Sequence, residues 1–200
     1  MIDRLLKLNK SRYYQVAVYK SYAELNSESQ RFYIGYFWWI LQPIIELVVY
    51  YVFFAVLIKR REPDFIPFLF VGLLSWRWFL SSVNGAGNSL LKSKSLLNQI
   101  YLPKIVIPTI AIITNTAKFL ISFFIVILFL WLYGLPVSLA YWSLPLVFLA
   151  QLLFILFLAF LMAGIIPFVP DIKILFDNLM RAGFFLSGVL FASSSMPVEH

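Results

Sequence analysis

The side chains that usually perform catalysis are scarce or isolated in this sequence. The one histidine is His200, and there is no cysteine, so a Ser-His-Asp triad, a Cys-His pair and a histidine or thiolate metal site are excluded. The carboxylates form no closely spaced D-x-D pair, and none of the eight glycines precedes a lysine, so the P-loop motif is absent. We therefore predict no catalytic, cofactor-binding or metal-ligating residue and no ATP site on this chain.

Two ionisable residues lie deep inside apolar segments and need a reason to be there. Glu46 stands 13 residues into the segment 33–58, and Lys118 stands 13 residues into the segment 105–133. A charge at the centre of a bilayer costs about 2.5–3.5 kcal/mol on insertion scales. Matching depth and opposite sign predict that Glu46 and Lys118 form an interhelical pair. A polar contact with a transported cargo is the alternative interpretation.

The elements that must hold these residues are long apolar helices. Hydrophobic residues make up 62% of the chain and charged residues 12%, which excludes an ordinary soluble domain. Roughly 20 helical residues cross the ~30 Å hydrocarbon layer of a membrane, and a backbone in lipid must satisfy its own hydrogen bonds. We predict an all-α integral membrane protein, a polytopic bundle with five spans at residues 33–58, 65–82, 105–133, 139–169 and 174–192.

The distribution of basic residues predicts the orientation of these spans. Six lysines and arginines precede the first span, three lie between the second and third, and one lies between the fourth and fifth. Three follow the first span, which makes ten on one side against three on the other. The positive-inside rule then places the N-terminus in the cytoplasm. The net charge of +7 is thus explained by topology, and we predict no nucleic-acid partner.

Two segments outside the spans are amphipathic. Residues 1–30 mix apolar and basic side chains and predict a helix along the inner membrane surface; a solvated charged tail is the alternative. The run of Asn and Gly at residues 84–89 predicts a chain break, followed by a short cytosolic helix at residues 89–101 that ends before Pro103.

Aromatic side chains make up 19% of the chain, and several gather where the first span begins. Aromatic rings can stack on the C–H faces of sugars, although packing against lipid and neighbouring helices is their commoner use. If these rings stack on sugars, four of them are candidates for a translocation path: Tyr33, Tyr36, Phe37 and Trp39.

Taken together, several blocks of sequence resemble the permease subunit of type-2 ABC transporters that export polysaccharide, those of O-antigen, capsule or teichoic acid. The blocks are Gly35-Tyr-Phe-Trp-Trp-Ile-Leu-Gln-Pro43, residues 67–76, Asn88-Ser-Leu-Leu, Tyr101-Leu-Pro-Lys-Ile-Val-Ile-Pro108, Pro170-Asp171 and residues 184–188. They occur in the family's order and cover the chain from about Arg31 onward.

The resemblance implies a homodimer in the bacterial inner membrane that works with two copies of a separate ABC ATPase, which would bind the ATP. Its cargo would be a lipid-linked glycan passed between the two permease copies, in contact with membrane lipid. The resemblance also implies that the helix at residues 89–101 couples to the ATPase. The residues expected to make that contact are Leu90, Lys92, Lys94, Leu96, Leu97 and Tyr101.

One departure from the family concerns the end of the sequence. Family members have six spans, with short re-entrant helices before the last, whereas this sequence stops at Met196-Pro-Val-Glu-His200, where that region should begin. We therefore expect the last span to be missing. The alternatives to glycan export are a type-2 permease for a lipid or drug and a truncated membrane scaffold that transports nothing. A membrane glycosyltransferase is disfavoured because the carboxylates are not paired.

Overall fold

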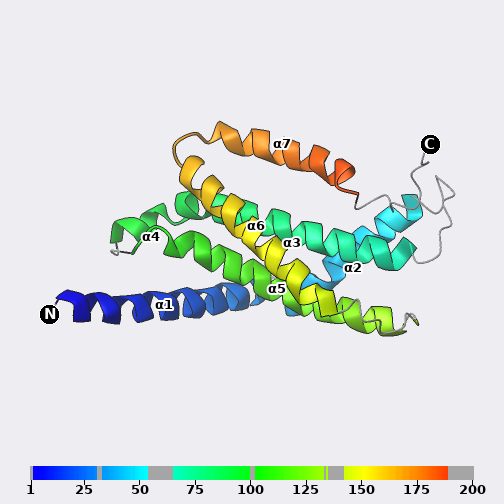
Figure 1. The fold of residues 1–200 in the computed structure, drawn as a ribbon, viewed down its shortest axis with the longest axis horizontal. Coiled ribbons are helices and arrows are strands. Elements are labelled where there is room, and N and C mark those ends of the chain that lie inside the picture. Colours follow the sequence, from blue (N-terminus) through cyan, green and yellow to red (C-terminus); the bar gives the residue numbers. More distant parts are fainter. Residues whose placement is uncertain are drawn as a thin grey trace.

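The computed structural model describes residues 2–30, 33–53, 65–99, 102–132, 134 and 142–188, and these form helices without any strand. Figure 1 shows their arrangement. The elements in chain order are α1 (Ile2–Gln30), the 3-10 helix η1 (Gly35–Phe37), α2 (Trp38–Val52), α3 (Phe65–Lys92), α4 (Lys94–Gln99), α5 (Val106–Leu132), α6 (Leu144–Ile165) and α7 (Asp171–Leu186).

Helix α3 is the centre of the bundle, with α5 packed alongside it and α6 crossing both (Figure 1). Leu69 and Val83 of α3 are fully buried, as is Ile155 of α6. Because lipid tails are as apolar as these side chains, close packing and polar contacts must hold such helices together. Helix α3 supplies such close packing through its extensive interfaces with α5 and α6.

Aromatic stacking and side-chain hydrogen bonds join the helices around α3. The Trp78 ring stacks on Phe119 of α5 with centroids 4.2 Å apart, and its Nε1 donates to Thr116 Oγ1 at 3.2 Å. Between α6 and α3, Gln151 Nε2 donates to the carbonyl oxygen of Ser75 at 2.8 Å. Each bond satisfies a polar group that would otherwise face hydrocarbon.

Four helical stretches are long and apolar enough to cross a membrane: Gly35–Val52, Phe65–Lys92, Val106–Leu132 and Leu144–Ile165. They correspond to the first four predicted spans and confirm an all-α, multi-pass membrane protein. The fifth predicted span falls on α7, whose 16 residues end at Leu186. Residues 189–192 lie outside the described part of the chain, so the fifth span stays a prediction.

The chain break predicted at residues 84–89 is wrong, because α3 continues through this segment to Lys92. A Cβ atom on Gly85 would lie 2.9 Å from Asn115 Nδ2 of α5, and one on Gly87 would lie 2.7 Å from Ile166 Cδ1. The glycines therefore serve close approach between helices, as small residues do in membrane bundles. The separate helix beyond them is α4, shorter than the predicted 89–101.

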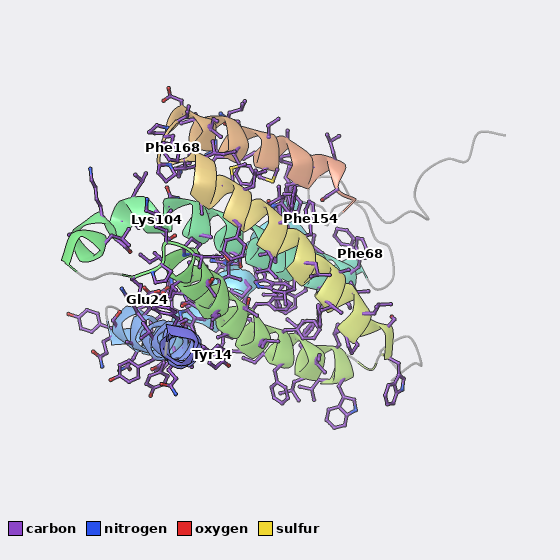
Figure 2. The ribbon with its side chains drawn as sticks, turned by 60° about the vertical axis from the view of Figure 1, so that its left-hand side comes forward. Tyr14, Glu24, Phe68, Lys104, Phe154 and Phe168 are labelled. Carbon is purple, nitrogen blue, oxygen red and sulfur yellow. The ribbon has the colours of Figure 1, made fainter. Side chains whose placement is uncertain are left out.

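Helix α1 packs beside the first half of α5. Ala17 is buried against Val106 and Ile110, and Ser21 Oγ donates to the Ile110 carbonyl oxygen at 3.3 Å. Figure 2 views α1 almost along its axis, whereas α5 and α6 extend across the view, so α1 crosses the bundle obliquely. Residues 2–30 are thus one helix, and its position on the inner membrane surface stays a prediction.

Candidate functional site: a charged cavity inside the bundle

A cavity of about 290 Å³ lies where the end of α1 meets α2, α3 and α5. We call it the central cavity. Charged and amide side chains line it beside aromatic ones, an unusual combination at the middle of membrane-spanning helices. The lining includes Glu28, Trp39, Gln42, Arg77, Asn115 and Lys118.

Two ion pairs stand at this cavity. Arg77 Nη1 of α3 donates to Glu46 Oε1 of α2 at 2.6 Å, and Lys118 Nζ of α5 donates to Glu28 Oε2 at the end of α1. Both pairs are partly shielded, with side-chain exposures of 29% and 39% in the first and 21% and 40% in the second. Each cation inside the bundle therefore has a carboxylate partner on a different helix.

The pair predicted between Glu46 and Lys118 is wrong, since each residue has a different partner in the structure. The physical reason is geometric. Counting residues from the end of a helix gives the depth of a side chain but not its direction around the helix axis. Glu46 projects toward α3, and Lys118 projects toward the last turn of α1.

The environment of Lys118 is well defined. Its Nζ lies 5.7 Å from the centroid of the Trp39 ring, a cation–π distance. Ser122 Oγ, one turn along α5, donates to the Trp39 carbonyl oxygen at 3.1 Å and ties α5 to the start of α2. Asn115 Nδ2 donates to the Ser81 carbonyl oxygen at 3.2 Å, which joins α5 to α3 at the same level. These bonds fix the walls of the cavity.

The central cavity adjoins two others. An α1-side cavity of about 380 Å³ shares Glu28, Asn115 and Lys118 with it and reaches Lys20 and Lys92. An α7-side cavity of about 360 Å³ shares Arg77 and contains Glu46, Tyr50 and Arg181. The α1-side cavity thus lies between the end of the bundle that carries α4 and the central cavity.

Of the residues predicted for a translocation path, one reaches the central cavity. Trp39 lines it, whereas Tyr33, Tyr36 and Phe37 are exposed on the surface. Tyr36 packs edge-on against Trp39 at 5.0 Å, and its hydroxyl donates to Asn26 Oδ1 at 3.0 Å. Their role in a path stays a prediction.

The residues predicted to contact an ATPase are divided between two helices rather than carried by one. Lys92 and Lys94 are exposed, and the role of these residues in ATPase binding stays a prediction. The structure places Leu90 and Lys92 at the end of α3 and Lys94 and Leu97 on α4, whereas the side chain of Leu96 and the whole of Tyr101 lie outside the described residues.

Sequence reasoning missed Glu28 and Arg77 as parts of this site. Arg77 stands twelve residues from the start of α3, and a charge inside an apolar helix is itself a signal that a partner is needed. Glu28 stands near the end of a polar, basic segment, where nothing in the sequence indicates a contact with a span. Its partner is 90 residues away in the chain.

Comparison with known proteins gives the family. No protein-family model matches the chain. The O-antigen export system permease protein RfbA of Myxococcus xanthus is 31% identical over 176 residues, which are 88% of this chain and 68% of that protein. Two proteins of the same name from Klebsiella pneumoniae are each 26% identical over 82% of this chain and 64% and 63% of their own lengths.

The chain thus spans about two thirds of the length of the curated relatives that it matches. The aligned part contains most of the helices described above, including the four that can cross a membrane. With this identity over nearly nine tenths of its residues, the chain belongs to the family of O-antigen export system permease proteins.

Proposed function

We propose that this chain is the membrane-spanning subunit of an ATP-driven exporter that moves a lipid-linked polysaccharide across the bacterial inner membrane. The observation that carries the proposal is the 31% identity to a named O-antigen export permease over 88% of this chain. The chain supplies membrane-spanning helices and has no P-loop, so a separate ATPase would provide the energy. The N-terminus would lie in the cytoplasm, by the distribution of basic residues.

The connection between α3 and α5 is the part best suited to receive force from an ATPase. Helix α4 sits in this connection, and α3 and α5 share the largest interface of the bundle. A push on α4 would therefore reach the central helix and its main neighbour together. Lys92 and Lys94 are exposed there and would steer an acidic partner surface. Two copies of the chain would enclose the path for the glycan.

Complementation tests the proposal. The full chain, produced together with its partner ABC ATPase, should restore surface glycan in a strain whose own O-antigen permease gene is deleted. The strain is chosen so that its lipid-linked glycan is one that this permease and ATPase accept. Immunoblotting of intact cells measures the surface glycan. Glycan that stays inside the cell, although the chain reaches the membrane and binds the ATPase, would contradict glycan export and favour a lipid or drug as cargo.

A matched pair of variants on α4 tests the coupling role. Leu97→Asp should abolish co-purification of the ATPase, because a charge replaces a half-buried apolar contact residue. Ser95→Asp adds the same charge at an exposed position of the same helix and should leave co-purification intact. Equal recovery of the ATPase with both variants would place the coupling contact elsewhere, for example at the connection between α6 and α7.

A further inference from the structure

We propose that the central cavity binds the phosphoryl group of an anionic amphiphile between Arg77 and Lys118. Two sources share this chemistry: the headgroup of a bilayer phospholipid and the diphosphate of a lipid-linked glycan. The second source rests on the proposed function, whereas the first does not. Arg77 and Lys118 each have a carboxylate partner, but their remaining N–H donors favour a further anion over an uncharged carbohydrate or a metal cation.

The first argument is the excess of hydrogen-bond donors. A guanidinium carries five N–H groups and an ammonium three. Among the described residues, Arg77 donates one hydrogen bond, from Nη1 to Glu46, and Lys118 donates one to Glu28. Of the three cavities, Glu46 lines the α7-side one, whereas Arg77 lines both that cavity and the central one. The remaining donors of Arg77 and Lys118 are available to a ligand in the central cavity.

The second argument is the chemistry of the walls and the space. Arg77 and Lys118 both line the central cavity with donors that their partners Glu46 and Glu28 do not use, so an anionic acceptor suits it. Arginine binds phosphoryl oxygens with two parallel bonds, and lysine binds them as a point charge. About 290 Å³ corresponds to roughly ten waters at ~30 Å³ each, which leaves room for a phosphoryl group and its neighbouring atoms. Gln42 adds an amide to the same wall.

The third argument is access. The α1-side cavity, lined in part by Lys20 and Lys92, lies next to the central cavity and shares Glu28, Asn115 and Lys118 with it. Three lysines line this cavity, Lys20, Lys92 and Lys118, against the two glutamates Glu24 and Glu28, and this small cationic excess favours anions. A phosphoryl group at Lys118 would also compete with Glu28 for the ammonium, because both ligands are anionic. Occupancy should therefore loosen the end of α1 from α5.

Native mass spectrometry of the purified full chain tests the proposal with three probes: phosphatidylglycerol, undecaprenyl diphosphate and an uncharged diacylglycerol. The wild type should retain at least one of the two anionic probes and not the diacylglycerol. The anionic probe that is retained identifies the source of the phosphoryl group. Arg77→Gln combined with Lys118→Gln should raise the Kd of that probe tenfold or more.

Control variants separate binding from folding. Lys104→Gln removes an exposed charge outside the three cavities and should leave the Kd unchanged (Lys104 is labelled in Figure 2). Lys118→Arg keeps the charge and should retain binding. A photoreactive group near the phosphate of the retained probe should, on the wild type, crosslink to residues of α2, α3 or α5 around the cavity.

Three results would overturn the proposal. They are retention of neither anionic probe by the wild type, an unchanged Kd in the double variant, and crosslinks confined to the outer surface of the bundle. These measurements require neither the ATPase nor transport of a glycan. Failure of phosphoryl binding would therefore leave the export proposal standing, and failure of export would leave the binding result standing.

Discussion

Neutralising Glu46 should destabilise the protein mainly through Arg77 and hardly at all through Lys118. Glu46 Oε1 accepts a hydrogen bond from Arg77 Nη1 at 2.6 Å between α2 and α3. In Glu46→Gln the guanidinium keeps its charge inside the bundle but loses its anionic partner. The double variant Glu46→Gln/Arg77→Gln removes the orphaned charge as well, so its loss of stability should be smaller than the sum of the two single losses.

The expected coupling energy follows from the burial of the pair. Breaking a fully buried pair costs about 3–5 kcal/mol, whereas interhelical hydrogen bonds in membranes average about 0.6 kcal/mol with a maximum near 1.7. The two side chains are 29% and 39% exposed, so the pair is only partly shielded. We expect a coupling energy of about 1 kcal/mol, which is about fivefold in the unfolding equilibrium.

A double-mutant cycle measured by unfolding in mixed micelles gives this energy. The control cycle uses Glu46→Gln with Lys118→Gln, which also removes opposite charges but from residues with different partners. The control should be additive within about 0.3–0.5 kcal/mol. Appreciable coupling in the control cycle, with none between Glu46 and Arg77, would refute the pairing described above.

Two further predictions concern packing and topology. Gly87→Leu should destabilise the bundle by about 1–3 kcal/mol, because a Cβ there would lie 2.7 Å from Ile166 Cδ1 and 3.3 Å from Met162 Cβ of α6. Gly164→Leu should not, because nothing lies within 4 Å of a Cβ there. Unfolding in mixed micelles compares the two variants, and equal stabilities would argue against close contact at Gly87. The chain has no native cysteine, so single cysteines report topology. In whole cells, an impermeant thiol reagent should label Trp142→Cys from outside but Lys94→Cys only after permeabilisation. The reverse pattern would invert the orientation.

The sequence was most informative where a single physical force decides the structure. The apolar runs that became α5 and α6 could be predicted because a span of lipid requires roughly 20 apolar helical residues. The helix through Gly85 and Gly87 could not, since glycine and asparagine ordinarily break helices in water. There the gain from close approach of α5 and α6 outweighs local propensity, and that gain depends on tertiary packing.

The site was predictable only in part. The sequence indicated that Glu46 and Lys118 needed partners, because isolated charges inside a membrane are costly. It could not indicate which partners, since Glu28 and Lys118 are brought together by α1 crossing α5, a contact between residues 90 positions apart. Trp39 was singled out as an aromatic residue, and its place beside Lys118 emerged only from the folded bundle.

ATP-driven movement of glycan is the central claim, and inverted membrane vesicles that contain the full chain and its ATPase test it most directly. Lipid-linked glycan made on the outer face of these vesicles is open to an added glycosidase until it is carried inside. If the chain carries glycan with energy from ATP, ATP should make the glycan resistant to the enzyme, whereas a non-hydrolysable analogue should not. Equal digestion with and without ATP, while the bound ATPase hydrolyses ATP, would contradict this claim.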